Sequence, residues 1–410
     1  MKRHKPDFMI LFIVLTLVAF GFLMVYSASM VWAVMVVGKS PTYYVERQII
    51  FALLGLALMV VLMNIGPTTY KKLARWIAVL SFIMLIAVLI PGIGHKAAGV
   101  RRWLGPIQPS ELAQVGILFY LANIFDNNKN KLQQFKRGVL PPFAMLGFQF
   151  VLIVLEPDMG SGMLLLMSGL VVIFAAGVKW RHMAAISAIL VPCIALFAVL
   201  EAYRNIRIKV FLHPWSAKYL NLGGYQIQQS LMAIYHGGWF GQGIGNGIAP
   251  YLYLPIPHED FIFAVIVEEL GIVGAFVVLA LYASLVWRGI RVGLHLNHRF
   301  SSLLAYGLSG MIGMGALINV AAVTGLIPVT GIPLPFISYG GTALVAKMAA
   351  MGVLLGLSRY TDEDVPKRVR LPENVLLLHE AAQIPQQVIP QRSGTPPKKQ
   401  SATKKKRGIK

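Results

Sequence analysis

Charged residues are scarce in this sequence: Asp, Glu, Lys and Arg make up 13% of the 410 residues, and hydrophobic residues make up 57%. A soluble globular protein carries about 25% charged residues, so the composition excludes that class. The sequence also lacks a repeat of fixed period, which argues against a solenoid. The single cysteine, Cys193, excludes an internal disulfide. Apolar runs of about 18 residues or more match the hydrocarbon core of a bilayer, and they predict a membrane protein.

Acidic residues are the scarcer of the two charged classes, with 16 Asp and Glu against 37 Lys and Arg, a net charge of +21. So basic a chain could bind nucleic acid, but its cations fall in short segments between apolar runs and in the C-terminal tail. A cationic stripe interleaved with aromatic residues is absent. The charge therefore predicts membrane topology and attraction to anionic membrane lipid, and no nucleic-acid partner.

The apolar runs predict an all-α, polytopic membrane domain over residues 1–360, because only helices satisfy the backbone of such runs in lipid. The N-terminal run is too long for a cleaved signal peptide. A basic tail follows at 361–410, rich in proline and lysine, and we expect it to be disordered. About ten membrane helices are expected, at 8–30, 45–65, 73–92, 110–125, 139–155, 160–178, 182–202, 261–287, 302–325 and 339–358.

The short basic segments also predict the orientation in a bacterial cytoplasmic (inner) membrane. Placing the N-terminus in the cytoplasm puts the clusters at 71–75, 129–137, 179–181 and 288–299 on the cytoplasmic side, as the positive-inside rule requires. An even number of spans returns the C-terminal tail to the cytoplasm. Several cations remain outside, where they could serve an anionic ligand or simply be solvated: Arg47, Lys96, Arg101, Arg102, Arg204, Arg207, Lys209 and Lys218.

One long extracytoplasmic loop, residues 203–260, is expected between the seventh and eighth helices. It is rich in glycine, proline and aromatic residues, and loops of this length usually carry function. Short amphipathic helices and turns are expected at 211–215, 224–230 and 237–247. The glycines at 237–243 superficially resemble a nucleotide-binding loop, but they lack the strand–turn–helix context of that motif.

Two adjacent acids, Glu259 and Asp260, lie where this loop enters the eighth helix. A carboxylate that is partly desolvated there could act as a general base near neutral pH. The alternative is helix capping, which an acid at a helix N-terminus also favours, and residue types alone favour capping. Glu268 and Glu269 follow one to two turns into the apolar helix, and we interpret them as structural partners of internal polar groups.

Three further segments combine local structure with candidate function. Pro109 and Glu111 suit the first turn of a helix, whereas Arg101 and Arg102 beside Trp103 suit a pyrophosphate contact. The turn at 156–162 contains Asp158, and turn chemistry explains it as well as function does. The segment at 325–341, with three prolines and Ser338, should line a cavity or be buried in protein.

Together these segments resemble the SEDS family (shape, elongation, division and sporulation), named for RodA, FtsW and SpoVE. The resemblance covers about residues 8–360. It is carried by GIPLPFISYGG at 331–341, by 224–243, by HEDFIFAVIVEELG at 258–271, by QPSE at 108–111 and by Pro157-Asp158.

This resemblance implies a ten-helix fold and a peptidoglycan glycosyltransferase that polymerises lipid II, an undecaprenyl-pyrophosphate disaccharide-pentapeptide, into β-1,4 glycan strands. It implies Asp260 as the general base, and Arg47 and Arg102 as ligands of the pyrophosphate. The other residues expected to bind substrate are Arg101, Glu111, Gln114, Asp158 and Ser338. The implied protein partner is a class B penicillin-binding protein. No cofactor is expected with certainty, although Mg²⁺ or Mn²⁺ is a candidate for the pyrophosphate.

The chain departs from the family pattern at several positions. Gln114 stands where the family often has lysine, Glu259 replaces a threonine, and Leu252 replaces a frequent glutamate. The segment at 101–111 is a few residues shorter than usual. Two alternatives follow: a lipid II flippase, and a non-catalytic scaffold for the penicillin-binding protein if these departures abolish catalysis. The sequence does not distinguish roles in division, elongation or sporulation.

Overall fold

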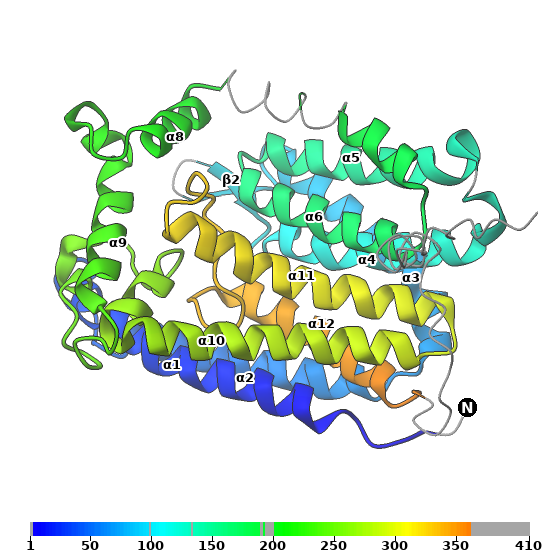
Figure 1. Cartoon of the computed structure of the whole chain (residues 1–410), viewed down its shortest axis with the longest axis horizontal. Helices are drawn as coiled ribbons and strands as arrows, with labels where there is room; N and C mark the ends of the chain where they lie inside the picture. The colour runs from blue at the N-terminus through cyan, green and yellow to red at the C-terminus, as the bar shows by residue number, and fades with distance from the viewer. Residues whose placement is uncertain (1–2, 98–99, 133, 189–191, 193–200, 362–410) are drawn as a thin grey trace, which may run out of the picture.

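The computed structural model describes residues 3–97, 100–132, 134–188, 192 and 201–361. Its core is a bundle of long helices that lie side by side (Figure 1). The bundle is formed by α1 (Phe8–Met35), α2 (Tyr43–Met63), α3 (Pro67–Leu89), α4 (Pro109–Asn127), α5 (Leu140–Leu155), α6 (Met159–Ala175), α10 (Ile262–His295), α11 (Arg299–Val323) and α12 (Gly341–Ser358). The prediction of an all-α polytopic membrane protein is thus confirmed.

Among the residues that the structure describes, seven helical segments are long and apolar enough to cross a membrane: α1, α2, α3, Phe135–Leu155, α10, α11 and α12. The α6 helix is apolar but shorter. The α4 helix is more polar, and most of its polar side chains are shielded because α3, α6 and α11 pack around it. Of the expected seventh helix, at 182–202, the structure describes a helix at 180–188, and the remainder lies almost wholly outside the described residues.

The outer helices of the bundle are more exposed than the inner ones, as expected for a bundle surrounded by lipid. Most residues of α2 and α3 are at least partly exposed, whereas most of α12 is buried between its neighbours. The α12 helix packs along α2, and α10 packs along α11. Burying α12 needs small residues, and Gly352 shows why: a Cβ there would lie 2.6 Å from the carbonyl oxygen of Met59 in α2.

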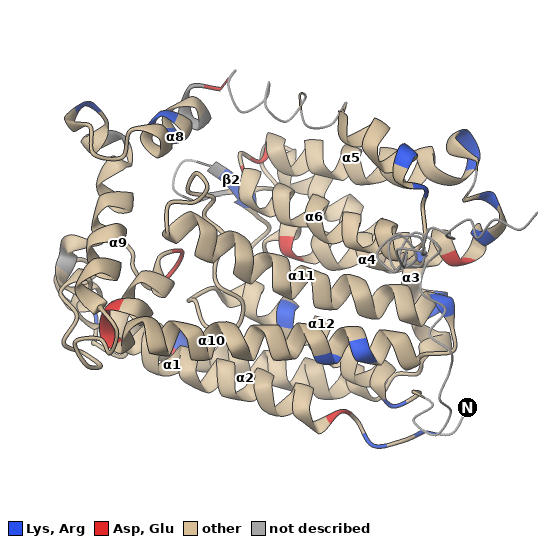
Figure 2. Ribbon diagram, in the orientation of Figure 1, with Lys and Arg blue, Asp and Glu red and all other residues tan. Residues whose placement is uncertain are grey.

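One end of the bundle carries the described parts of both chain termini. His4 donates its backbone N–H to the carbonyl of Arg359 (2.8 Å), directly after α12. Figure 2 shows many of the Lys and Arg residues at this end. Here α4 and α5 are joined through two short helical turns, η1 (Lys129–Lys131) and η2 (Phe135–Val139).

The opposite end carries the expected long loop and a small hairpin (Figure 1). The loop is built from α8 (Ala202–Leu212), η3 (Ala217–Leu222), α9 (Gly224–Gly237) and η4 (Ala249–Tyr253). The hairpin pairs β1 (His95–Ala97) with β2 (Val100–Trp103) in antiparallel register. The expected short helices and turns are found: 211–215 is the end of α8 followed by a turn, 224–230 lies in α9, and 238–247 forms turns.

Those turns insert into a break in α10. Gly271 has a positive φ of 71°, so the helix is interrupted there. The backbone N–H groups of Gln242 and Gly243 donate to the carbonyls of Glu268 and Glu269, at 2.9 Å each. Across the break, Ile272 donates to the carbonyl of Gly238 (2.9 Å). The glycine-rich loop therefore replaces the missing helical hydrogen bonds of α10, which explains its glycines without a nucleotide.

Candidate active site

Asp260 lies in the turn just before α10, at the end of the bundle that carries the long loop. Its backbone carbonyl accepts a hydrogen bond from Nδ2 of Asn319 in α11 (2.8 Å), and the same amide donates to the carbonyl of Ile332 (2.7 Å). Its half-buried side chain faces the 325–341 segment, because a Cβ on Gly331 would lie 3.4 Å from Oδ2 of Asp260. Asn319 thus fixes the turn against the segment that Asp260 faces.

A capping hydrogen bond does not explain the acidic pair. The N-cap of α10 is Phe261, and neither Glu259 nor Asp260 makes a side-chain capping bond there. Neither acid therefore caps α10 through a hydrogen bond, and the favourable effect of the helix dipole on an acid at this end stays an alternative. Glu268 and Glu269 were expected to be structural partners of internal polar groups, and this is confirmed. Glu268 accepts from the backbone N–H groups of Ile248 (3.0 Å) and Ala249, and Glu269 accepts from the hydroxyl of Ser27. These two carboxylates hold η4 and α1 against α10.

Opposing charges surround Asp260. Burial raises the pKa of Asp260 above its usual value; Arg207 and Arg102 lower it, and the negative charge of Asp158 raises it further. These four residues come from four elements: the turn before α10, α8, β2 and the start of α6. The fold thus brings one candidate base and two guanidinium groups within electrostatic reach of each other.

Arg102 and the turn at 156–158 form one wall of this site. Nε of Arg102 donates to the carbonyl of Glu156 (3.1 Å), and its Nη2 donates to the carbonyl of Pro157. Asp158 caps α6 by accepting from the N–H of Ser161 (3.0 Å), and it also accepts from Nε2 of Gln108 (3.1 Å). The turn interpretation of Asp158 is thus satisfied, and the negative charge of its carboxylate also reaches Asp260 electrostatically.

Glu156 is buried in this wall, and within the described part of the chain neither of its carboxyl oxygens has a hydrogen-bond partner. Burial, with the nearby charge of Asp158, raises the pKa of Glu156 to about 9, although Arg102 opposes the shift. The carboxyl group is therefore protonated at neutral pH. It adds no negative charge to repel a phosphate-bearing ligand.

An aromatic wall is formed around His258, two residues before Asp260. The ring of His258 lies 4.2 Å from that of Tyr44 and 5.8 Å from that of Tyr339 (centroid distances). Burial lowers the pKa of His258 to about 4, so the ring is neutral. Burial raises the pKa of Glu259 to about 7, with a smaller contribution from Asp260. At neutral pH this wall therefore carries the positive charge of Arg47 and a Glu259 carboxyl that is about half ionised.

Arg47 and Ser338 belong to this aromatic wall. The exposed guanidinium of Arg47 lies 4.7 Å from the ring centroid of Tyr43 and within electrostatic reach of the hydroxyl of Tyr339. Ser338 is buried, and its Oγ accepts from the N–H of Leu334 (2.8 Å). Arg47 is therefore positioned to meet a ligand, while Ser338 shapes the segment that carries Tyr339.

Glu111 and Gln114 lie deeper in the bundle. Nζ of Lys347, in α12, forms an ion pair with Glu111 and donates to Oε1 of Gln114 (2.8 Å). All three side chains are buried. The structure thus gives Lys347 two partners, Glu111 and Gln114. The cation that the SEDS resemblance places at position 114 thus comes here from α12.

The predicted residues fall into two sets. Asp260, Asp158 and Arg102 lie within electrostatic reach of one another, with Arg47 and Ser338 on the neighbouring wall. Glu111 and Gln114 form the second set, deeper in the bundle. Arg101 is next to Arg102 in β2, and alternation along a strand directs its side chain to the other face. The structure adds Arg207, which sequence reasoning counted only as an external cation, and Asn319, whose signal was a lone amide near the end of an apolar helix.

A metal site is not preassembled in the residues that the structure describes. No group of three His, Cys, Asp or Glu side chains is placed there to ligate an ion. Mg²⁺ is commonly held by one or two carboxylates together with substrate phosphates. Asp158 and Asp260 are the carboxylates suited to that arrangement, and the expected ion stays a prediction.

Known proteins are similar to this chain in sequence and in fold. The family model of the FtsW, RodA and SpoVE cell cycle proteins matches residues 7–363. Stage V sporulation protein E of Bacillus subtilis is 39% identical over 365 residues, which cover 88% of this chain and 99% of that protein. A probable peptidoglycan glycosyltransferase FtsW of a Geobacter species is 38% identical, over 86% of this chain and 96% of that protein.

Two solved structures are also similar. A chain from a peptidoglycan synthase complex, described for the coordination of polymerization and crosslinking, superimposes with a TM-score of 0.71 at 28% identity, over 87% of this chain and 99% of that one. The rod shape determining protein RodA of Thermus thermophilus gives a TM-score of 0.63 at 28% identity, over 87% and 98% of the two chains.

Proposed function

Since this chain belongs to the FtsW, RodA and SpoVE family of cell cycle proteins, we propose that it is a peptidoglycan glycosyltransferase that polymerises lipid II into β-1,4 glycan strands. The observation that carries the proposal is the setting of Asp260: a carboxylate of raised pKa within the reach of Arg102 and Arg207. Probable peptidoglycan glycosyltransferases among the relatives support the reaction class.

In the proposed reaction, Asp260 accepts the proton of the 4-hydroxyl of the acceptor's N-acetylglucosamine. That oxygen attacks the anomeric carbon of the donor's N-acetylmuramic acid and inverts it. The bond from this carbon to the pyrophosphate breaks, and undecaprenyl pyrophosphate leaves with the bonding electrons. A raised pKa suits a base that takes up a proton near neutral pH.

Guanidinium groups would stabilise the charge that develops on the pyrophosphate. We assign this role to Arg102 and Arg47, because planar guanidinium groups match phosphate oxygens in two-point contacts. Contact of Arg101 with the substrate stays a prediction, because alternation along β2 directs its side chain to the face opposite that of Arg102. Protonated Glu156 favours binding of the anion, since it contributes no negative charge. Preorganised cations of this kind lower the barrier without moving during the reaction.

The buried cluster of Glu111, Gln114 and Lys347 would support the site from below. Ser110, one residue before Glu111, approaches Oδ2 of Asp158 at 3.5 Å, so the start of α4 is part of the Asp158 wall. We propose that the ion pair fixes α4 and α12 in the arrangement that places this wall. Direct contact of Glu111, Gln114 or Ser338 with the substrate stays a prediction.

The proposal includes an orientation and a partner. The long loop and Asp260 face the extracytoplasmic side of the bacterial membrane, where lipid-linked disaccharide is polymerised, and both termini are cytoplasmic. A class B penicillin-binding protein would crosslink the strands, and the similar chain in a peptidoglycan synthase complex supports such a partner.

Purified protein with its cognate penicillin-binding protein and lipid II tests this function. Asp260→Asn should reduce strand synthesis by at least about a hundredfold, because loss of a general base costs about 10²–10⁴ in rate. Glu259→Gln, the matched change at the adjacent carboxyl, should leave synthesis near the wild-type level. Persistence of synthesis in Asp260→Asn would remove Asp260 from its role. Lipid II translocation in liposomes by that variant, without strands, would favour a flippase.

A further inference from the structure

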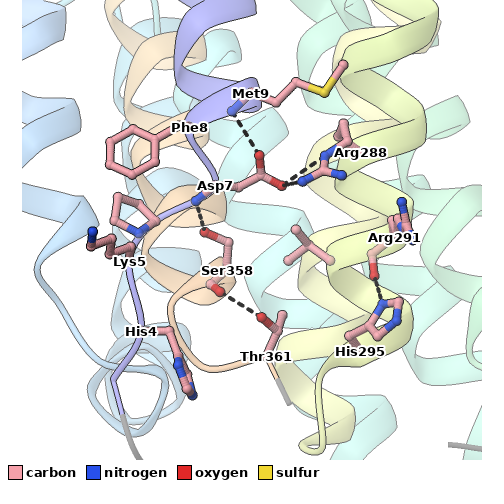
Figure 3. Close-up of a pocket in the computed structure, with 12 residues that line it drawn as sticks. His4, Lys5, Asp7, Phe8, Met9, Arg288, Arg291, His295, Ser358 and Thr361 are labelled. Atoms are coloured by element: carbon pink, nitrogen blue, oxygen red, sulfur yellow. Dashed lines mark hydrogen bonds and ion pairs between the residues drawn. The ribbon is translucent and has the colours of Figure 1, made fainter. Parts of the chain in front are cut away.

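A cavity of about 720 Å³ lies at the end of the bundle that carries both described chain ends (Figure 3). Asp260 precedes the opposite end of α10. The walls of the cavity are the segment before α1, the last turns of α10 and the end of α12. Hydrogen bonds join these walls: Asp7 donates its backbone N–H to Oγ of Ser358 (3.0 Å), and His4 donates to the carbonyl of Arg359 (2.8 Å). The cavity is thus formed by elements already fixed to each other.

The described lining of this cavity is strongly cationic. Lys5, Arg288 and Arg291 line it together with His4 and His295, and Asp7 is the one carboxylate among the lining residues that the structure describes. The permanent cations therefore outnumber the anion by three to one.

The single carboxylate is fully engaged. Oδ1 of Asp7 caps α1 by accepting from the N–H groups of Met9 (3.0 Å) and Ile10 (3.3 Å). Oδ2 accepts from Nε (3.0 Å) and Nη2 (2.7 Å) of Arg288. Asp7 therefore compensates Arg288 and leaves Lys5 and Arg291 to attract a further anion.

Lipid-facing apolar side chains adjoin these cations. Phe8 is 62% exposed and Met9 is 44% exposed, at the start of α1. Trp287 is 54% exposed on α10, and the guanidinium of Arg291 lies 5.3 Å from its ring centroid. Tryptophan gathers at the boundary between the hydrocarbon core and the headgroups. Trp287 thus indicates that the cavity is near headgroup level, with exposed apolar surface beside it.

We propose that this cavity binds the phosphate-bearing headgroup of an anionic membrane lipid. Arg291, Lys5 and the remaining N–H groups of Arg288 supply charge and hydrogen bonds for the phosphate oxygens. Phe8, Met9 and Trp287 supply apolar surface for the acyl chains. A soluble phosphate would use the cations alone and would leave this apolar rim without a role.

Native mass spectrometry of the full-length protein, titrated with phosphatidylglycerol or phosphatidylcholine in detergent, tests the assignment. Each Lys or Arg near an anionic lipid raises the affinity for that lipid by a factor of about five. The double variant Lys5→Gln/Arg291→Gln should therefore bind phosphatidylglycerol about 25-fold more weakly. Both side chains are exposed, so the fold should tolerate the change. Arg291→Lys, which keeps the charge, should bind phosphatidylglycerol nearly as well as the wild type.

Lys72→Gln/Arg75→Gln is the matched control. It removes one lysine and one arginine that are exposed at the same end of the bundle, in α3, and that do not line the cavity. Wild-type affinity in this control, together with the loss in the cavity variant, supports the site. Equal losses in both variants would show a diffuse attraction of the basic surface and would overturn it.

Two further arms distinguish the other anions. Displacement of phosphatidylglycerol by millimolar inorganic phosphate at constant ionic strength would identify a soluble phosphate site and would overturn the lipid assignment. The acidic run Asp362-Glu363-Asp364 directly follows Thr361, which lines the cavity. If phosphatidylglycerol binds only after these three acids are changed to their amides, the chain's own acidic run is the occupant and the proposal fails. Unchanged affinity in that variant supports the lipid.

Discussion

The proton affinity of Asp260 results from neighbours that act in opposite directions. Burial and Asp158 favour the protonated acid, whereas Arg207 and Arg102 favour the carboxylate. A proposed base must be deprotonated to work, so the rate should fall as the pH decreases through its pKa. The two arginines therefore extend the working range of the site toward lower pH.

Removing Arg207 should move the acidic limb of the pH–rate profile to higher pH. Without this guanidinium the pKa of Asp260 rises further, so Arg207→Gln should be inactive at a pH where the wild type still works. Arg207→Lys should retain part of the effect, because it keeps the charge. The measurement is lipid II polymerisation as a function of pH.

The control for this prediction is Lys218→Gln, which removes an exposed cation of the same loop. Its acidic limb should coincide with that of the wild type. Arg207 also donates from Nη1 to the carbonyl of Val329 (2.8 Å), so a purely structural role is conceivable. A uniformly slower rate with an unmoved limb would assign Arg207 that structural role and would contradict the electrostatic one.

Single residues could be predicted where their chemistry is local. The apolar setting of Glu268 and Glu269 predicted internal polar partners, and the structure supplies the backbone of η4 and the hydroxyl of Ser27. Lys347 could not be assigned in this way, because its partners Glu111 and Gln114 are 236 and 233 residues away in sequence. Asp260 was ambiguous, since the residue types suit a cap as well as a base.

Among the elements, α4 and α12 depend on the buried pair of Glu111 and Lys347. Lys347→Met should destabilise the protein by about 3–5 kcal/mol, because it leaves a buried carboxylate without its partner. The double variant Lys347→Met/Glu111→Gln should recover most of that loss. Unfolding of detergent-solubilised protein, analysed as a double-mutant cycle, measures the coupling.

The matched control is the surface pair of Lys71 and Asp126, in which the lysine side chain is 44% exposed. Lys71→Met should cost about 1 kcal/mol or less, because water screens an exposed pair. Equal costs at the two lysines would contradict the view that the buried pair holds α4 to α12.

The break in α10 gives a second prediction at this scale. Gly271→Ala should destabilise the protein by about 2–4 kcal/mol, since alanine is strained at positive φ and its Cβ would lie 2.3 Å from the carbonyl oxygen of Trp239. Gly147→Ala in α5 is the control, because no atom lies within 4 Å of the added Cβ. It should be neutral or slightly stabilising, as alanine favours helix. Thermal unfolding compares them.

Helix existence was predictable for these elements, whereas their ends and their break were not. An apolar run marks where the chain crosses the membrane but not where the helix begins and ends. The α2 helix, at Tyr43–Met63, therefore differs by two residues at each end from the predicted 45–65. The α10 helix continues to His295, beyond the predicted 287, because Arg288 and Arg291 lie on turns that extend past the apolar run. The interruption at Gly271 depends on the 238–243 loop, which no periodicity reveals.

At the scale of the whole molecule, the chain separates two chemistries along the bundle. The loop end holds Asp260 with its arginines, and the end with both termini holds the cationic cavity beside Trp287. The ion pair of Glu111 with Lys347 lies within the bundle between α4 and α12. Composition predicted the bundle, and the short basic loops predict its orientation in the membrane. Only the fold shows which loop residues meet at Asp260.

The orientation decides whether this arrangement can function as proposed, because the polymerase needs Asp260 on the extracytoplasmic side. In a Cys193→Ser background, Tyr235→Cys in α9 should react with a membrane-impermeant maleimide in intact spheroplasts, since Tyr235 is 83% exposed. Lys72→Cys, exposed at the other end of the bundle, should react only after permeabilisation. The reverse pattern would place Asp260 in the cytoplasm, where no extracytoplasmic glycan could reach it, and the proposed reaction would be untenable whatever the activity of the relatives.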